Sequence, residues 1–403
     1  MKIVIHTMYF LPEFGSAPIL MNELAESLAR RGHEVQVVTT LPRPPHNAGY
    51  EGRMYVKERR AGFVAKRTLT NFTAHHIGRL IAWSIYTLFT MGHLATVKRG
   101  EVVFLRLPPL QLGVTGFLAR TLRGARVLLN VQDIHPDLSI ESGLLRNPFL
   151  IKAALAFERW IYRCHRNIVV ISDGFKNNLR TKGVPSSKIS VIPNWVDTDF
   201  LRPLDKDNPV ARRFGLADRF VVMYSGTISI SSTDTLVRLL DAAALLRDDP
   251  KILFAVVGDG FKAKDLKAEA ERRGLPNVAF LPFQPYPDLP HLLASADVLL
   301  VPLDKEKSLL SVPSKLYNFM AAGRPILGLA VEGSEVHALI TGSGCGTCVP
   351  PDDPALIAAA IRGLGADPAR RGSHAAAGRA YALAHFSRES VVDAFERLME
   401  SMA

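Results

Sequence analysis

Residues 2–40 read KIVIHTMYFLPEFGSAPILMNELAESLARRGHEVQVVTT and contain the pattern that decides the fold. The apolar, β-branched run at 2–7 predicts a buried strand. A helix is expected at 17–31, because leucines recur at every fourth position and Gly32 follows as a stop. A second strand is expected at 35–39. Strand, helix and strand in this order predict a parallel sheet with a crossover helix.

The same alternation continues along both halves of the chain. Strands are expected at 102–105, 127–131, 168–171, 220–224, 252–257, 278–281, 298–301 and 325–329. Helices are expected at 111–122, 147–164, 233–246, 262–272 and 387–402. A polar, proline-broken linker at 202–209 separates the halves. The pattern predicts an α/β fold of two Rossmann-like domains, 1–197 and 198–386, with the segment 387–403 packing back on the first.

Composition indicates a folded enzyme whose charge is unevenly distributed. The chain has 403 residues, of which 48% are hydrophobic, and a net charge of +11. Residues 1–200 carry 26 Lys and Arg against 14 Asp and Glu, whereas residues 201–403 carry 23 against 24. We therefore expect the first half to face something anionic. Three cysteines exclude a disulfide-built secreted scaffold, and the first residues lack the pattern of a signal peptide.

An apolar run from Leu80 to Leu94 is shorter than the roughly twenty residues that a membrane-spanning helix needs. It predicts either a buried core helix or a helix lying on a membrane surface. Six basic residues precede it, namely Arg53, Lys57, Arg59, Arg60, Lys66 and Arg67. Basic residues beside an apolar, aromatic face suit an anionic bilayer, so we favour the membrane interpretation. No nucleic-acid-binding pattern is present, so nucleic acid is not an expected partner.

Two segments have the pattern of a phosphate-binding loop. Gly15 and Ser16 follow the first strand and precede a helix, where backbone amides can meet a phosphate. In the second half, Lys315 begins a helix that follows a proline, and Asn318 lies about one turn further on. The lysine can neutralise a diphosphate, and the asparagine can bond a ribose or sugar hydroxyl. Each segment can also be an ordinary turn or helix cap.

Six segments together resemble glycosyltransferase family 4, which has the GT-B fold. They are YFLPEFG at 9–15, LARRGHEV at 28–35, VIPNWVDTDF at 191–200, VGDG at 257–260, ADVLLVPL at 296–303 and KLYNFMAAGRPI at 315–326. The resemblance covers almost the whole chain in the right order. It implies two Rossmann-like domains with parallel sheets facing across a cleft, the second binding a nucleotide sugar and the first an acceptor. The similar subgroup builds bacterial O-antigen, capsule and colanic-acid-type polymers and includes N-acetyl-L-fucosaminyltransferases.

The resemblance and the loop patterns give one set of donor-binding candidates: Gly15, Ser16, Gly226, Thr227, Gly258, Asp259, Gly260, Phe283, Ser311, Pro313, Ser314, Lys315 and Asn318. The chain also departs from the family. Many members carry a Glu-x7-Glu pair, but the matching positions here are Leu310 and Asn318. Arg and Lys, frequent after the first strand of the second domain, are replaced by hydroxyl residues after Gly226. Lys315 is therefore the main candidate for neutralising the diphosphate.

Residues 130–137, NVQDIHPD, place two carboxylates around an imidazole directly after a predicted strand of the basic half. Asp133 is the first candidate for activating the acceptor hydroxyl or stabilising charge, and His135 is the second. A capping aspartate with a surface histidine is the alternative. The subgroup has a comparable Asp-Leu-Trp-Pro-Glu/Asp stretch, which favours the catalytic interpretation. Glu13, in a neighbouring loop, is a third candidate that could contact either substrate.

Two other patterns resemble metal sites without the context that such sites need. Asp197-Thr-Asp199 spells a DxD sequence, but it follows IPN and precedes the linker, so we expect a turn and a cap. Cys345 and Cys348 form a lone CxxC pair without a second pair or nearby histidines. No bound metal and no cofactor are expected.

Together, these features predict a glycosyltransferase that moves a sugar from a UDP-sugar, preferred over a GDP-sugar, to a lipid-diphosphate-linked sugar. The sugar would be an N-acetylated hexosamine or deoxyhexosamine, and the product a bacterial surface polysaccharide. The family implies retention of configuration, and the protein would lie on the cytoplasmic face of the inner membrane. Two alternatives stay open: a UDP-sugar 2-epimerase of the same fold, and a non-catalytic nucleotide-sugar-binding partner of a membrane assembly.

Overall fold

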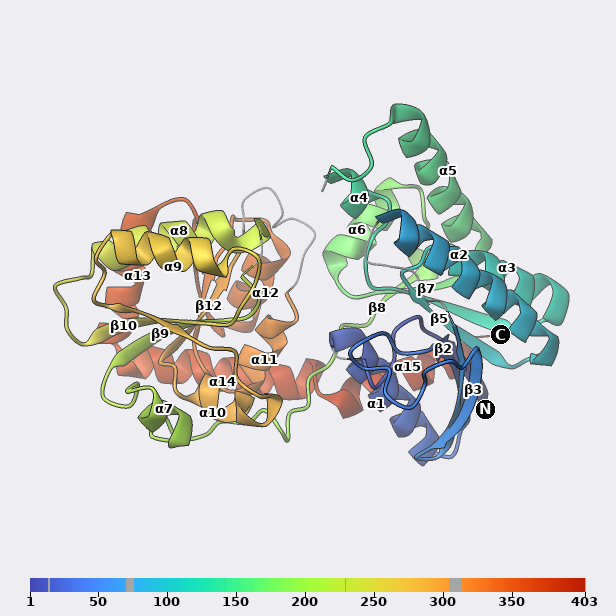
Figure 1. Ribbon diagram of the computed structural model, residues 1–403, viewed down its shortest axis with the longest axis horizontal. Helices are drawn as coiled ribbons and strands as arrows, with labels where there is room; N and C mark the ends of the chain where they lie inside the picture. The colour runs from blue at the N-terminus through green and yellow to red at the C-terminus, as the bar shows by residue number, and fades with distance from the viewer. Residues whose placement is uncertain (14, 70–75, 142, 229, 304–312, 403) are drawn as a thin grey trace. The chain divides into compact units, whose positions relative to one another are not determined.

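The computed structural model describes residues 1–13, 15–69, 76–141, 143–228, 230–303 and 313–402 (Figure 1). The chain forms two compact units. The first comprises Met1–Asn194 and Val391–Ala403, and the second comprises Trp195–Ser390. Each unit is a sheet covered by helices on both faces. The expected α/β fold of two parallel-sheet domains is confirmed, with one antiparallel strand as an exception.

The sheet of the first unit has the strand order β3-β4-β2-β1-β5-β6-β7-β8. Its strands are β1 (Lys2–His6), β2 (Glu34–Thr40), β3 (Tyr55–Arg60), β4 (Phe63–Thr68), β5 (Val102–Leu107), β6 (Arg126–Val131), β7 (Asn167–Val170) and β8 (Ile189–Val191). All neighbours pair in parallel except β3, which is antiparallel to β4 at the sheet edge. The basic segment of the sequence is thus a β-hairpin, which the expected element list lacked. Its charged residues hid the alternation of buried and exposed positions in β4.

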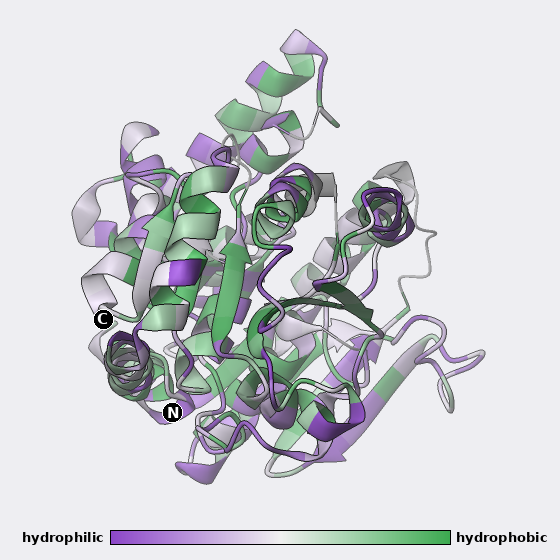
Figure 2. Cartoon of the chain, turned by 90° about the vertical axis from the view of Figure 1, so that its left-hand side faces the viewer, coloured by the Kyte–Doolittle hydropathy of each residue, from purple (hydrophilic) through white to green (hydrophobic). Residues whose placement is uncertain are grey.

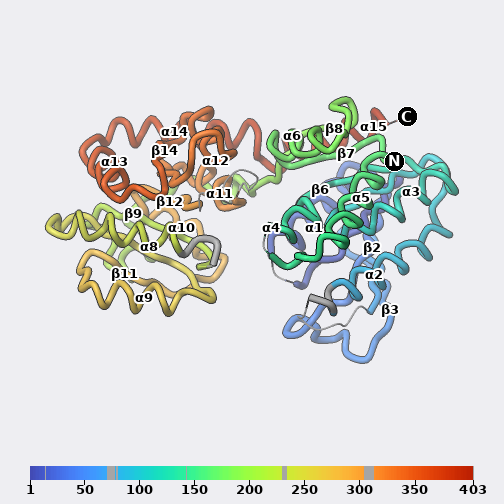
Figure 3. The backbone as a smooth tube through the Cα atoms, turned by 90° about the horizontal axis from the view of Figure 1, so that it is seen from above, coloured from blue at the N-terminus to red at the C-terminus, as the bar shows by residue number. Residues whose placement is uncertain are grey.

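Helices cover both faces of this sheet. They are α1 (Ser16–Arg30), α2 (His76–His93), α3 (Leu112–Arg123), α4 (Asp137–Glu141), α5 (Pro148–Cys164), α6 (Asp173–Thr181) and the final helix α15 (Arg388–Ser401), with short 3-10 turns at Leu94–Thr96 and Ser186–Lys188. One core joins α2, α3, α5 and α6 to β5, β6 and β7. On the other face, Phe395 of α15 contacts Phe104 of β5, with ring centroids 5.5 Å apart. Both termini therefore lie in the first unit (Figures 1 and 3).

The sheet of the second unit has the order β11-β10-β9-β12-β13-β14, and all of its pairs are parallel. Its strands are β9 (Phe220–Ser225), β10 (Ile252–Val257), β11 (Val278–Leu281), β12 (Val298–Pro302), β13 (Ile326–Leu329) and β14 (Gly346–Val349). Its helices are α7 (Pro209–Arg213), α8 (Ile230–Ala244), α9 (Ala263–Arg272), α10 (Leu289–Ala294), α11 (Lys315–Ala321), α12 (Glu335–Ser343), α13 (Pro354–Ala366) and α14 (Pro368–His385), with a 3-10 turn at Tyr286–Asp288.

Two hydrophobic layers flank this second sheet. Helices α8, α9 and α13 pack on one face, and α7, α10, α11, α12 and α14 pack on the other. In Figure 2 the central strands have the hydrophobic colour, and hydrophilic residues lie mostly on helices and loops. In each sheet, the parallel strands end at one common edge. Ligands of such folds bind beyond that carboxyl edge, so the site is sought there.

Candidate functional site

In the second unit, two glycine loops run side by side after β9 and β10. The amide of Ile228 donates to the carbonyl oxygen of Asp259 at 2.9 Å, which joins the loops. A Cβ on Gly258, whose φ is +137°, would lie 2.1 Å from the carbonyl oxygen of Gly226. A Cβ on Gly260 would lie 2.3 Å from the carbonyl oxygen of Ile228. Only glycine allows this approach of the two backbones, which brings amide groups and a small surface to the carboxyl edge.

Lys315, the first residue of α11, places its ammonium against these loops. Its Nζ lies 4.1 Å from the centre of the Tyr224 ring and 3.0 Å from the position that a Cβ of Gly226 would occupy. Burial lowers the pKa of Lys315 to about 8. Within the described part of the chain, no carboxylate pairs with it. A desolvated cation that only an aromatic face accompanies is well suited to hold a diphosphate.

The remaining donor candidates of the second unit lie around these loops, and their side chains are accessible to different degrees. Those that are exposed are Thr227, Asp259, Phe283 and Ser314, and those that are half-buried are Pro313 and Asn318. Phe283 follows β11 and is 76% exposed, so its ring is free to stack on a ligand. Ser311, and Leu310 with it, lies outside the residues that the structure describes. Tyr224 was not predicted, because it reads as one more apolar residue of a buried strand.

In the first unit, Asp133 follows β6 and is exposed at the carboxyl edge. Arg106, in the neighbouring strand β5, is only 8% exposed, and its Nε has no hydrogen-bond partner in the described part of the chain. Burial lowers the pKa of Arg106 to about 10, and the charge of Asp133 opposes this effect. Sequence reasoning missed Arg106. The available signal was a single charged residue inside an otherwise apolar strand.

A series of hydrogen bonds between side-chain amides fixes the loop that carries Asp133. The side chain of Gln132 donates to Asn130 at 3.1 Å and accepts from Asn194 at 2.9 Å. Asn130 is fully buried, so this chain of hydrogen bonds anchors the loop to the sheet. The loop is therefore set by residues of β6 and by the segment that follows β8.

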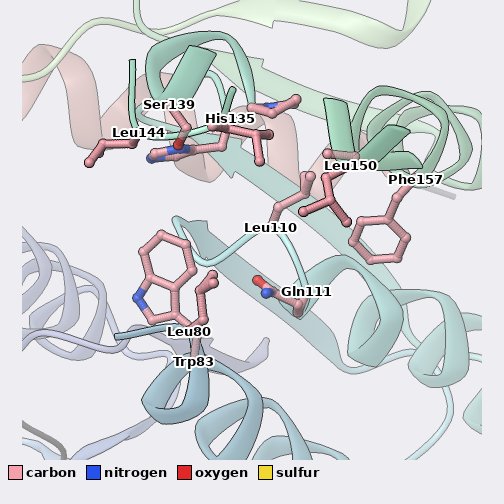
Figure 4. A pocket seen from close by; sticks show the side chains of 12 residues that line it. Leu80, Trp83, Leu110, Gln111, His135, Ser139, Leu144, Leu150 and Phe157 are labelled. Carbon is pink, nitrogen blue, oxygen red and sulfur yellow. The ribbon is translucent and has the colours of Figure 1, made fainter. Parts of the chain in front are cut away.

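His135 lies at the edge of an apolar pocket of about 370 Å³ (Figure 4). Its Nδ1 is 3.1 Å from the Ser139 hydroxyl, and its ring meets the edge of Trp83 with centroids 5.6 Å apart. Trp83 comes from α2 and, in Figure 4, lies across from the loop that carries His135. The other lining residues are mostly apolar: Leu80, Leu110, Gln111, Pro136, Ser139, Leu144, Leu145, Leu150, Ala154 and Phe157. An apolar cavity directly beside a polar catalytic candidate suits a ligand with an aliphatic part.

Glu13, the third catalytic candidate, is buried and already engaged. Its Oε1 accepts from the backbone amide of Arg43 at 3.1 Å and from the guanidinium Nε at 2.8 Å. These bonds connect the loop after β1 with the loop after β2. Gly15 and Ser16 follow at the start of α1, and both are exposed. They lie in the first unit, apart in the chain from the other donor candidates.

The basic residues before α2 do not all face solvent, which corrects the reasoning from charge. Arg67 is fully buried, and its Nε donates to Glu58 at 2.6 Å. Arg60 also pairs with Glu58, at 3.0 Å. Glu58 lies between the two guanidinium groups, so its carboxylate compensates one of their two charges within the hairpin. Arg53, Lys57 and Arg59 are exposed, whereas Lys66 is half-buried against His93.

Helix α2 contains the apolar run that begins at Leu80. It has features both of a buried core helix and of a helix that lies on a membrane surface. Trp83 and Tyr86 belong to the core, whereas Leu80, Ile81 and Leu88 are 52%, 42% and 66% exposed. No helix in the described residues is both long enough and apolar enough to cross a bilayer. One face of α2 thus packs on the sheet, and the other presents leucine and isoleucine side chains.

The DxD sequence acts as a turn and cap, as expected. Oδ1 of Asp197 accepts from the amides of Asp199 at 3.0 Å and Phe200 at 2.9 Å. Burial raises the pKa of the Cys345 thiol to about 11 and that of Cys348 to about 12. Among the described residues, no group of three His, Cys, Asp or Glu side chains could hold a metal ion.

Two family models match most of the chain. Residues 17–195 match the glycosyl transferase 4-like domain, and residues 219–367 match the glycosyl transferases group 1 domain. The chain is 30% identical to the putative colanic acid biosynthesis glycosyl transferase WcaI of Escherichia coli, over 98% of each chain. It is 27% identical to the probable glycosyltransferase WbjE of Pseudomonas aeruginosa, over 68% of each. The structure of Anabaena HepE in complex with UDP matches with a TM-score of 0.75 at 17% identity, covering 100% of both chains.

Proposed function

The chain belongs to the glycosyltransferase family of these two domains and has its GT-B fold, and from this premise we propose that it transfers a sugar from a UDP-sugar to a lipid-linked sugar acceptor. The product would be a bacterial surface polysaccharide; the name of WcaI gives putative colanic acid biosynthesis for that relative. In this proposal the second unit binds the donor and the first unit binds the acceptor.

Lys315 and the glycine loops support a nucleotide diphosphate as the donor. The ammonium is buried, lies over Tyr224 and has no carboxylate partner among the described residues. Negative charge that develops on the departing diphosphate would be stabilised by Lys315 without rearrangement of the surrounding protein groups. Because Lys315 supplies this positive charge, we expect transfer to need no divalent cation. The UDP bound in HepE favours a uridine nucleotide over a guanosine one.

The single observation that carries the lipid-linked acceptor is the apolar pocket beside His135 (Figure 4). A free sugar is polar and gains little from a cavity lined by leucine, tryptophan and phenylalanine. In this proposal Asp133, two residues before His135, would take the acceptor hydroxyl, and the buried Arg106, whose charge interacts with that of Asp133, would take a phosphate of the linkage. An acceptor with a hydroxyl, a phosphate and an aliphatic chain matches this combination of groups.

The transfer breaks the bond between the anomeric carbon and the diphosphate oxygen, and UDP leaves with the electron pair. A new bond forms between the anomeric carbon and the acceptor oxygen, whose proton passes to the carboxylate of Asp133. We expect the anomeric configuration to be retained, as the family resemblance implies, so the acceptor oxygen would attack from the face of the sugar that the diphosphate leaves. The sugar is expected to be an N-acetylated hexosamine or deoxyhexosamine.

The test is a release assay with the purified chain over a panel of UDP- and GDP-sugars, with and without a polyprenyl-diphosphate sugar. We expect UDP release that depends on the acceptor, a lipid product heavier by one sugar, and no change with a chelator. Altered donor in the absence of acceptor would instead identify a UDP-sugar 2-epimerase. Donor binding with no turnover across the panel would identify a non-catalytic partner.

The exposed face of α2 and the exposed basic residues Arg53, Lys57 and Arg59 support a place on the cytoplasmic face of the inner membrane. The ring contact between Tyr55 and Phe89, 6.3 Å between centroids, brings β3 beside α2. Sedimentation with anionic vesicles tests this. Binding that Lys57→Glu and Leu88→Ser leave unchanged would contradict it.

A further inference from the structure

A second pocket lies at the opposite edge of the first sheet, where the strands begin. It has a volume of about 330 Å³. Four arginines line it: Arg99 from the loop before β5, Arg120 from α3, Arg126 at the start of β6 and Arg166 directly before β7. Asp133 follows the other end of β6, ~17 Å away at about 3.3 Å per residue. The pocket is thus separate from the acceptor region.

The charges of these arginines are not neutralised. No Asp or Glu lines the pocket, and none of the four guanidinium groups forms an ion pair among the described residues. Arg126 instead donates to two carbonyl oxygens, that of Gly100 at 2.9 Å and that of Met402 at 3.2 Å. Carbonyl partners hold this guanidinium in place but leave its charge uncompensated. Arg31 and Arg67 of the same unit, in contrast, each contact a carboxylate.

His165, also in the lining, is a buried imidazole close to the positive charge of Arg120. It is 2% exposed, its Nδ1 lies 2.7 Å from the carbonyl oxygen of Ile161, and its Nε2 has no partner in the described chain. Its pKa is lowered to about 4, first by burial and then by the charges of Arg120 and Lys188. The imidazole is therefore neutral, and the cationic side chains of Arg120 and Lys188 lie close to it.

The helix dipole explains the position of only one of the four arginines. Arg120 lies in the last turn of α3, where a cation is favoured by the helix dipole. Arg99 and Arg126 lie outside helices, and Arg166 follows the end of α5. The backbone amides of Gly100, Gly124, Ala125 and Arg126 are already bonded to carbonyl oxygens, at 3.1, 3.2, 3.1 and 2.9 Å. The guanidinium groups are the donors that remain.

We propose that this pocket binds a phosphate-bearing anion. Guanidinium groups match the geometry of phosphate oxygens with paired hydrogen bonds, and several around one cavity favour a ligand with more than one negative charge. Two sources share this chemistry, a soluble diphosphate and the headgroup of an anionic phospholipid. The proposal is independent of the sugar-transfer chemistry.

The test compares three variants of the full chain by calorimetric titration with inorganic diphosphate. Arg120→Gln with Arg166→Gln removes two guanidinium groups that bond nothing else in the described structure. Arg180→Gln with Arg247→Gln makes the same charge change at exposed positions outside the pocket. Lys315→Ala reports binding at the donor region. We expect the pocket variant to lose one class of diphosphate sites, with affinity at that site at least tenfold weaker than in the control, whereas Lys315→Ala keeps that class and loses the one at the donor region.

A second arm uses vesicles of phosphatidylcholine alone or mixed with phosphatidylglycerol. Weaker sedimentation of the pocket variant with the mixed vesicles, relative to its control, identifies the headgroup as the source. A difference only with inorganic diphosphate identifies a soluble ligand. Equal behaviour of the pocket variant and the control in both arms overturns the proposal. Thermal unfolding of each variant separates lost binding from lost folding, and sugar transfer is measured in parallel as an independent readout.

Discussion

The donor region of the second unit and the acceptor region of the first both face an anion in our proposal, and they place positive charge differently. In the second unit a single lysine, Lys315, lies against backbone loops that only glycine can form. In the first unit the charge of a buried arginine, Arg106, interacts with that of Asp133, and an apolar pocket lined by His135 follows in the same loop.

This contrast shows that net charge is a poor guide to where an anionic substrate binds. Residues 201–403 carry no excess of basic residues, yet they contain the desolvated Lys315. Residues 1–200 carry the whole excess, but Arg67 and Arg60 share the carboxylate of Glu58, which compensates one of their two charges. A cationic side chain can bind an anionic ligand when burial has removed its hydration shell and no carboxylate forms an ion pair with it.

Asp133→Asn removes the carboxylate at the acceptor edge while preserving its shape. We expect kcat to fall ~10²–10⁴-fold, the range for loss of a general base, with donor affinity unchanged. Steady-state kinetics with saturating donor measures this. Asp173→Asn, an exposed aspartate of α6, is the matched control and should retain most activity. Full turnover by Asp133→Asn would place acceptor activation elsewhere.

Lys315→Ala removes the cation from the donor region. We expect kcat/KM for the donor to fall ~10²–10³-fold, since one preformed charge at a leaving group is worth about this much. Calorimetry with UDP should show a parallel loss of binding. Lys267→Ala, an exposed lysine of α9, provides the control. Equal effects of the two variants would contradict the role of Lys315.

Gly258→Ala tests the backbone contact of the donor loops. A methyl group would have to lie 2.1 Å from the carbonyl oxygen of Gly226, at a φ of +137°. We expect the free energy of unfolding to fall by about 1–3 kcal/mol, because strain of this kind must displace the loop. Urea unfolding measures it. Gly363→Ala, in α13 with open space around it, should not destabilise the protein.

Donor use should depend on pH through Lys315. The pKa of its ammonium is about 8, so the charge is present below this pH and lost above it. We expect kcat/KM for the donor to fall about tenfold per pH unit on the alkaline side. Lys315→Arg keeps its charge at alkaline pH and should remove this fall. An unchanged profile in Lys315→Arg would assign the titration to another group.

Leu150→Ser tests the apolar pocket. We expect KM for a polyprenyl-linked acceptor to rise about tenfold, since burying a leucine side chain is worth about 1.5–3 kcal/mol. A soluble acceptor analogue without the lipid should be unaffected. Leu245→Ser is a matched control, because both leucines are 52% exposed. Equal effects on the lipid-linked and soluble acceptors would remove the pocket from acceptor binding.

The order of strands and helices follows from the sequence because hydrophobic periodicity and glycine stops are local signals. The strand-helix-strand pattern of residues 2–40, repeated along both halves, indicated two α/β domains; the loops after their strands contain Asp133 and Gly258, and Lys315 begins a helix. The hairpin of β3 and β4 was not foreseen, since its core positions are interleaved with lysine and arginine.

The packing of the folded chain determines which of these side chains keep a charge or a hydrogen-bonding group available to a ligand. Arg67 is neutralised by Glu58, Glu13 is held by Arg43, and Arg106 is left without a partner among the described residues. Trp83 meets His135 across a pocket that no local pattern reveals. Ion pairing and desolvation depend on residues that are far apart in the chain, so the charge available at a site is a property of the packed fold. The positions of the strands, in contrast, follow from local patterns in the sequence.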